Sequence, residues 1–462
     1  MECKGKSKEI MVTFLILIMG LMMAFMVPTW ETPDEYTHLW MIGDSIGVDG
    51  FADKITDSIE LQQERIEFHP EEKVDIKEQK DSMVESPKYV RSEMLPKAIH
   101  ISVIKHLPAT LGIILGILLG VPAYWVMQFG EIFSLIFYVY ICYLSLKLMP
   151  IKKEVMALLM LFPMAIQQAS SINYDAVLLP MCYLFIAFIF YLKFEKEEIG
   201  IRQFVIAMLI WCVITYIKMP YGLLGMLVFI IPLKKIKINL HIVVVDENLI
   251  RKCRIPVGIL MTVGFVGAVY VFRNNQYIQV VYGFVREWKR GIYLLTATGS
   301  TWTDFLMTST VGNFGWLDTP MLFSVVIVIF VVLAFVSLLR SDRNVEYKLD
   351  RKDRIVVLMT FILLCILITM SLANHTIKVI LFGSEQSSMT YEIREALYQI
   401  PYIGGLQGRY YLPFVSLLFI AIPECVKVDE RKKRLVLGAL EIVMYIYVFG
   451  LLVNRFWIAY TN

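Results

Sequence analysis

The chain has 462 residues, of which 57% are hydrophobic and 18% charged, and its mean hydropathy is +0.63. This balance lies far outside that of soluble globular proteins and indicates a polytopic membrane protein. The net charge of +3 carries little information, because the side of the membrane that each charge occupies matters more than the sum. Nothing in the composition suggests a nucleic-acid partner, and the seven cysteines show no disulfide or metal-binding spacing.

The N-terminal stretch 1–27 combines a basic start with an apolar run and lacks a small-residue cleavage site before Pro28. We therefore expect a retained signal anchor. A helix that crosses a bilayer needs roughly 20 apolar residues. This criterion predicts eleven spans, at residues 10–27, 129–149, 154–171, 176–192, 203–219, 221–233, 256–272, 320–339, 355–373, 410–425 and 435–456.

A further apolar stretch, 107–127, is long enough to compete, and counting it as a span would reverse the side of everything that follows. If it does not cross, 26 of the 44 lysines and arginines fall in short segments on one side, as the positive-inside rule requires of the cytoplasm. Its glycines, with Pro108 and Pro122, suit a broken segment. We therefore predict that 107–127 is interfacial or re-entrant.

The predicted fold is an all-α polytopic membrane protein of about 11 transmembrane helices that forms a single domain over 1–462. Its N-terminus is cytoplasmic and its C-terminus external. Three large external loops follow from this topology, at 28–128, 273–319 and 374–409, and the first contains the interfacial segment. The middle of that loop, 51–93, carries no motif that indicates a role.

Acidic residues follow directly on the first span, in "VPTWETPDEYTHLW". Thr32 as N-cap, Pro33 at the first helical position and Glu35 at the third predict a capping box that opens a helix. Glu35 then has a structural explanation. Asp34 shares a face of that helix with His38, four residues on, although the helix dipole alone also favours an acid there.

Three charged residues lie at predicted external ends of helices. Asp175 begins the fourth helix, Lys218 ends the fifth, and Arg409 begins the tenth after the glycine-rich "GGLQG". A helix-start acid and snorkelling cations are the simpler explanations. However, external membrane-edge cations run against the positive-inside bias, an acid at this depth is costly without a partner, and a guanidinium suits a phosphate.

Aromatic and polar residues accompany these positions. In "VGNFGWLDTP", Trp316 could stack on a sugar ring, and Asp318 or Thr319 could cap the helix that begins near Pro320. Gln407 and Tyr410 flank Arg409 and belong to the same candidate substrate loops. A second group of cations in the 273–319 loop is more simply a solvated basic face and comprises Arg273, Arg286, Lys289 and Arg290.

Taken in order, "PDEYTH", "FPMAIQQASSINYDA", "KMPY", "GNFGWLDTP" and "GLQGRYYLP" resemble the bacterial membrane family known as domain of unknown function 2142. That family looks like a branch of the GT-C glycosyltransferases. The resemblance implies a GT-C-like fold, with an acidic motif in the first external loop, interfacial helices like 107–127, and a polyprenyl-phosphate-linked sugar as donor. Asp34 and Glu35 stand at the positions of the acidic motif.

The resemblance implies transfer of a sugar to an envelope glycan, lipid or protein acceptor at the outer face of the cytoplasmic membrane. Asp34 would act as the base, and Glu35 would hold the helix or share that role. Asp175 and His38 would orient the acceptor or a divalent cation such as Mg²⁺ or Mn²⁺, for which no ligand spacing is fixed. Arg409 and Lys218 would bind the donor phosphate.

Two other classes of function compete with this hypothesis. A transporter or flippase of lipid-linked glycans would use the same external cations, but it would need ionisable residues in mid-membrane, which are largely missing from the predicted spans. A non-catalytic scaffold would explain the acidic loop but not the cations. No Walker loop, HExxH motif, GxSxG elbow or dinucleotide fingerprint is present.

Overall fold

The computed structural model describes residues 3–56, 91–239, 244–249, 251–252, 276–340, 347–381 and 395–458. The α-helices are α1 (Cys3–Met26), α2 (Glu35–Ser45), α3 (Phe51–Thr56), α6 (Arg91–Met94), α7 (Leu107–Leu119), α8 (Ala123–Leu148), α9 (Lys153–Met160), α10 (Pro163–Ala169), α11 (Asp175–Phe194), α12 (Ile201–Ile217), α14 (Gln276–Arg286), α15 (Trp288–Val311), α16 (Phe323–Leu338), α17 (Arg351–Leu381), α19 (Ser416–Ile420) and α20 (Glu430–Leu452).

Shorter helical turns and small strand pairs connect these helices. The 3₁₀ segments are η1 (Ile101–His106), η2 (Met219–Ile230), η3 (Leu233–Lys235) and η5 (Gly408–Tyr411), and η6 (Val453–Trp457) is a π-helical turn. The antiparallel pairs are β1 (Ile238–Asn239) with β2 (Val244–Val245) and β3 (Asn313–Phe314) with β4 (Thr319–Pro320), and β5 (Leu339–Arg340) pairs in parallel with β6 (Val426–Lys427).

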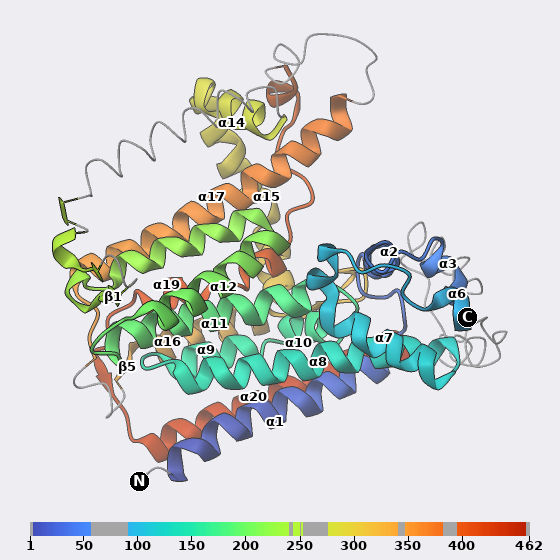
Figure 1. The fold of residues 1–462 in the computed structure, drawn as a ribbon, viewed down its shortest axis with the longest axis horizontal. Helices are drawn as coiled ribbons and strands as arrows, with labels where there is room; N and C mark the ends of the chain where they lie inside the picture. Colours follow the sequence, from blue (N-terminus) through green and yellow to red (C-terminus); the bar gives the residue numbers. More distant parts are fainter. Residues whose placement is uncertain are drawn as a thin grey trace.

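The long apolar helices run lengthwise in one bundle, with α1 and α20 side by side along one edge (Figure 1). Within the described residues, six helical segments are long and apolar enough to cross a bilayer. They are Lys8–Met26, Ile101–Leu119, Ala123–Leu148, Asp175–Phe194, Arg351–Ala373 and Leu435–Trp457, and the shorter apolar helices α12, η2 and α16 accompany them. The predicted count of about eleven spans is therefore not confirmed.

Two predicted spans are broken. The stretch 154–171 forms α9 and α10, because Pro163 cannot continue a helix but suits the first position of a new one. The stretch 410–425 contains only η5 and the five-residue α19. A third predicted span, 256–272, lies outside the described residues. Apolar composition did not predict helix continuity here.

The ambiguous stretch 107–127 forms a helical hairpin. α7 has 13 residues and ends at Gly120 in the left-handed conformation, and α8 begins at Ala123, earlier than the predicted 129. A Cβ on Gly112 would overlap the backbone of Phe129, so this glycine permits close packing of α7 on α8. α7 is about 20 Å long, roughly half of α8, and it lies at the α2 end of the bundle (Figure 1).

The predicted cytoplasmic segments meet at the opposite end of the bundle. Lys193 forms an ion pair with Asp353 at 2.8 Å, joining the end of α11 to the start of α17. β5 and β6 pair there as well. The N-terminus lies at this end, whereas α2 and α3 lie at the other (Figure 1). The structure thus separates the end that carries these predicted cytoplasmic segments, called the basic end below, from the end that carries the described start of the predicted first loop.

A separate apolar core places α2 on the bundle. Leu39 and Ile42 of α2 are fully buried in one cluster with Ile113 of α7 and Val126 of α8. Burial of each such side chain stabilises the fold by roughly 1.5–3 kcal/mol. The loop between α1 and α2 is therefore fixed at both ends.

Candidate functional site

The turn between α1 and α2 is built by residues in unusual backbone conformations. Trp30 and Asp34 both have positive φ, at 73° and 72°. α2 begins at Glu35, with Asp34 at the N-cap position and no side chain capping the helix. The predicted capping box at Thr32 is therefore wrong, because the left-handed turn at Asp34 delays the start of the helix.

Glu35 is a buried link between the first loop and the core. Its carboxylate accepts hydrogen bonds from the backbone N–H of Trp30 at 2.9 Å and of Ile172 at 3.2 Å. Burial raises the pKa of Glu35 to about 7 despite these bonds. The carboxylate faces backbone amides, so its role is to hold the loop against the α10–α11 turn. This position favours the expected structural role of Glu35 over sharing the role of base with Asp34.

Asp34 points the other way. Its side chain is 54% exposed and accepts a hydrogen bond from Arg409 Nη2 at 3.1 Å, which joins residues 375 positions apart. A left-handed conformation costs a residue other than glycine on the order of 1–3 kcal/mol, although aspartate and asparagine tolerate it best. The strained backbone of this turn thus presents an exposed carboxylate beside a buried guanidinium.

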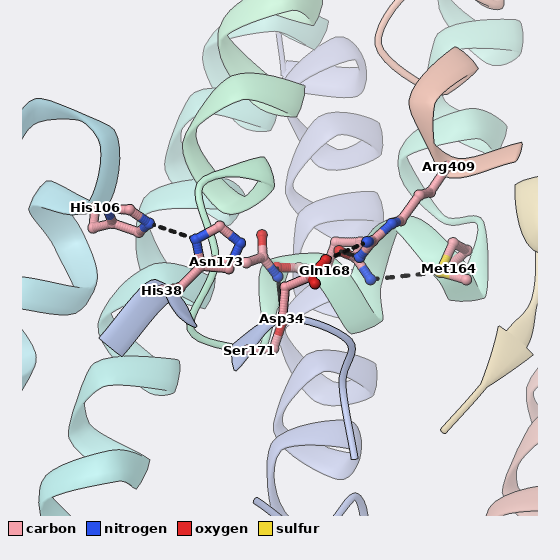
Figure 2. A network of polar contacts seen from close by, with 8 residues as sticks. All are labelled: Asp34, His38, His106, Met164, Gln168, Ser171, Asn173 and Arg409. Atoms are coloured by element: carbon pink, nitrogen blue, oxygen red, sulfur yellow. Dashed lines mark hydrogen bonds and ion pairs between the residues drawn. The ribbon is translucent and has the colours of Figure 1, made fainter. Parts of the chain in front are cut away.

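Arg409 is almost fully buried, and only part of its guanidinium is hydrogen-bonded to the described residues. Its Nη1 donates to Gln168 Oε1 at 3.0 Å, and its Nε has no hydrogen-bond partner among the described residues. Gln168 lies at the end of α10, where Asn173 holds the turn by donating to the Gln168 carbonyl at 3.1 Å. Figure 2 shows Asp34 and Gln168 converging on the guanidinium. No role was assigned to Gln168 from the sequence.

Gly408 fixes the position of Arg409. Its N–H donates to Ser309 Oγ at 2.7 Å, and a Cβ there would overlap the Leu306 carbonyl and Thr310. This glycine thus brings backbone close to α15, while the side chain of the next residue reaches the site. Gln407, at the start of η5, has a buried Oε1 without a hydrogen-bond partner in the described structure.

Lys218 lies in a cage of tyrosine rings. Its ammonium is 4.1 Å from the ring centre of Tyr410, 5.5 Å from that of Tyr174 and 5.8 Å from that of Tyr221. The charges of Asp175 and Arg409 both act on this ammonium. Ring faces attract a cation without neutralising it, so the rings hold the ammonium without pairing it with an anion.

Asp175 occupies the predicted place at the first position of α11, where Asn173 Oδ1 accepts the Ala176 N–H and caps the helix. It is half-buried, and its charge acts on both Lys218 and Arg409. The structure thus brings together Asp34, Asp175, Lys218, Tyr410 and Arg409. No single local pattern predicted that they would meet.

His38 belongs to a different contact. Its Nδ1 lies 2.9 Å from His106 Nε2 at the start of α7, and its ring packs edge-on against Tyr174. Burial, reinforced by Arg409 and Lys218, lowers the pKa of His38 to about 3. The imidazole is therefore neutral at pH 7. Within the described residues, no group of three or more His, Cys, Asp or Glu side chains could hold a metal ion.

The motif "GNFGWLDTP" forms the β3–β4 hairpin and not the start of a helix; α16 begins at Phe323. Trp316 Nε1 donates to the carbonyl of Trp30, which docks the hairpin on the first loop. Asp318 accepts from Arg455 at 3.0 Å, so it is no helix cap. These contacts place Trp316 and Asp318 around the loop and away from direct contact with Arg409.

Arg455 was not predicted. Besides its contact with Asp318, Arg455 lies near Glu31, with 3.7 Å between Nη2 and Oε2. Glu31 is 1% exposed, and its oxygens accept no hydrogen bond from the described residues. Burial raises the pKa of Glu31 to about 7. The signal that could have identified Arg455 is the one used for Lys218, a cation at the predicted external end of a span. In the second loop, Arg290 donates to the carbonyls of residues 397–400, and Arg273 lies outside the described residues.

Residues 17–418 match the model of a family described as "Predicted membrane protein (DUF2142)". The chain belongs to this family. No curated protein and no solved structure matches it.

The DUF2142 match covers both members of the Asp34–Arg409 pair and the cage around Lys218, whereas Arg455 lies beyond its end. The description establishes a membrane protein and names no activity. For this DUF2142 protein, the resemblance to GT-C enzymes is therefore a basis for a proposal.

Proposed function

We propose that this protein is a membrane glycosyltransferase of the GT-C type, which transfers a sugar from a polyprenyl-phosphate-linked donor to a cell-envelope glycan, lipid or protein acceptor at the outer face of the cytoplasmic membrane. The observation that carries the proposal is the pair formed by Asp34 and Arg409. A strained, exposed carboxylate lies against a buried guanidinium, and a second cation, Lys218, is held nearby with no carboxylate of the described residues bonded to it.

The two cations suit the donor phosphate. Arg409 is fixed by Gln168 and α15, and its Nε is an unused donor. The Lys218 ammonium lies among tyrosine rings that orient it. Preorganised cations in such an environment stabilise charge that develops on a leaving phosphate, because they need no reorganisation during the reaction.

Asp34 suits the base. In the proposed step the acceptor oxygen forms a bond to the anomeric carbon, and the bond from that carbon to the phosphate oxygen breaks. The acceptor proton passes to Asp34, and the electron pair leaves with the polyprenyl phosphate. A phosphate on Arg409 would compete for the guanidinium and free the carboxylate for the acceptor. A single displacement of this kind inverts the configuration of the sugar carbon.

One observation favours the transporter alternative. Glu131 of α8 is buried, and it accepts a hydrogen bond from Gln128 at 3.0 Å. An ionisable residue inside a membrane helix is a candidate for a substrate pathway. A flippase of lipid-linked glycans would move the donor without breaking its phosphate bond, so the product distinguishes the two functions.

Asp34→Asn is the decisive variant, because asparagine tolerates the left-handed backbone and has the same size but cannot accept a proton. Purified protein in lipid nanodiscs would be incubated with a panel of polyprenyl-phosphate sugars, and released polyprenyl phosphate would be measured by mass spectrometry. We expect wild-type release and a loss of about 10²- to 10⁴-fold in the variant.

Asp44→Asn on the exposed side of α2 is the matched control and should keep wild-type release. Undiminished release by Asp34→Asn would refute the base assignment. If lipid-linked glycan crosses vesicle membranes intact and no donor releases polyprenyl phosphate, the transferase proposal is overturned and the transporter function is supported. A product of retained configuration would exclude the single displacement.

A further inference from the structure

A cavity opens at the basic end of the bundle, opposite α2. The space between its walls, including volume that is open to the surroundings, is about 710 Å³. Its walls are apolar and come from α1, α8, α9 and α20; they comprise Met11, Val12, Leu146, Ala157, Leu158, Leu437 and Gly438. Charged side chains complete the lining: Lys8, Glu9, Lys153, Glu154, Lys433 and Glu441.

The described residues give no packing explanation for Gly438. Glycine inside a helix costs about 1 kcal/mol relative to alanine, and membrane helices usually use it to let two backbones approach. Here a Cβ on Gly438 would meet nothing within 4 Å. The missing side chain instead enlarges the cavity, which is what a site for a ligand requires.

The charges around the cavity alternate in sign. Glu9 pairs with Lys153 at 2.7 Å, and Glu154 pairs with Lys433 at 3.0 Å. With Lys8 and Glu441 the lining holds three lysines and three glutamates, so its formal charge is zero. A ligand with a single net charge would be repelled by half of these groups.

Glu441 is the carboxyl group that lacks a partner. It is 9% exposed and lines the cavity on the same helix as Gly438. No hydrogen bond or ion pair reaches its carboxyl group from the described residues. Side chains on a helix lean toward its N-terminus, so Glu441 points toward the charged rim. A buried acid of this kind needs a donor, and an occupant of the cavity can supply one.

We propose that this cavity binds one molecule of a zwitterionic aminophospholipid from the adjacent leaflet. The phosphate lies among the lysines, as in other pockets between membrane helices that bind phosphate headgroups. The ammonium donates to Glu441, and an acyl chain covers the apolar wall beside Gly438. A phospholipid matches an apolar cavity with a neutral, alternating rim better than a soluble anion or cation does.

The test measures lipid binding by the full-length protein. Detergent-purified protein would be titrated with palmitoyl-oleoyl phosphatidylethanolamine and, separately, with the corresponding phosphatidylglycerol, and bound lipid would be counted by native mass spectrometry. We expect wild-type protein to retain one phosphatidylethanolamine in preference to phosphatidylglycerol. Gly438→Leu fills the cavity and should weaken that binding at least about ten-fold, or 1.4 kcal/mol.

Gly450→Leu is the matched control, because Gly450 is on the same helix, also faces open space, and does not line the cavity. It should bind lipid like the wild type. Equal loss in both variants, or none in Gly438→Leu, would overturn the site. Glu441→Gln should abolish the preference for phosphatidylethanolamine over phosphatidylglycerol; an unchanged preference would overturn the assigned headgroup. Thermal unfolding checks that every variant is folded, and none of these readouts depends on the proposed transferase activity.

Discussion

Asp34 and Glu35 are neighbours in the chain but lie in opposite environments. The positive φ of Asp34 turns its carboxylate toward Arg409, whereas the next residue enters α2 and buries its carboxylate against backbone amides. A local helical pattern treats both as first-turn acids. Only the left-handed conformation distinguishes the exposed carboxylate from the structural one, and sequence does not predict that conformation for an aspartate.

Glu31 gives a prediction at the residue scale. Burial raises its pKa from 4.5 to about 7, so the folded state holds the proton more tightly than the unfolded state does. Its contribution to stability is complete below pH 4.5 and is lost as the pH rises to about 7. At pH 8, Glu31→Gln should therefore unfold at a higher temperature than the wild type. Its free energy of unfolding should be larger by about 1–3 kcal/mol.

The comparison must be made against the wild type at each pH. The pKa of His38 is lowered to about 3, so the contribution of His38 is complete above its ordinary value of 6.5 and decreases as the pH falls from there toward 3. This pH dependence has the opposite sign to that of Glu31, but it is the same in the Glu31→Gln variant and in the wild type. An equal difference between variant and wild type at pH 5 and pH 8 would show that Glu31 does not titrate as inferred.

At the scale of elements, η5 depends on its contact with α15. Gly408→Ala places a methyl group against the Leu306 carbonyl, which cannot move without distorting α15. We expect a loss of roughly 1–3 kcal/mol in stability, measured by thermal unfolding, because overpacking forces backbone shifts. Arg409 would move with η5, so any transfer activity should fall as well.

Gly299→Ala is the control for this prediction, because Gly299 is also on α15 but faces open space. It should leave stability unchanged or raise it slightly, since alanine is the better helix former. A Gly408→Ala protein as stable as the Gly299→Ala protein would show that the close contact does not hold η5.

Element boundaries show where sequence patterns stop being informative. Pro163 and the β3–β4 hairpin interrupt stretches that hydropathy and capping rules assigned to continuous or newly starting helices. Proline at a first helical position and proline in a strand pair look alike in sequence. The hairpin forms because Trp316 has the Trp30 carbonyl to bind, a partner that lies far away in the chain.

At the scale of the whole molecule, the bundle separates its charges. The Lys193–Asp353 ion pair joins predicted cytoplasmic segments at the end that holds the N-terminus, and α2, which begins directly after Asp34, lies at the other end (Figure 1). If the positive-inside rule holds, the basic end is cytoplasmic and the site faces outside. The orientation remains a prediction, as does the re-entrant placement of the α7–α8 hairpin.

Cysteine labelling tests both the orientation of the bundle and the re-entrant placement of the α7–α8 hairpin. Single cysteines at Lys97 and Leu119, two exposed positions that bracket η1 and α7, would be introduced into a cysteine-free background. A membrane-impermeant thiol reagent applied to intact cells should label both. Lys237→Cys, exposed near the basic end, should be labelled only after permeabilisation. Labelling of Lys97→Cys and Leu119→Cys from opposite sides would mean that this segment crosses the membrane.

The sequence by itself determined that this is a membrane protein, where most of its apolar helices lie, and which charged residues fall at one predicted surface, because hydropathy and charge bias are properties of short segments. It singled out Asp34, Lys218 and Arg409. Tertiary structure alone decided that these residues meet, that Gln168 and Arg455 join the surrounding network, and that the Glu35 carboxylate is buried against backbone amides. The physical reason is that a buried charge is positioned by helices that pack against one another from distant parts of the chain, and no local pattern records which helices those are.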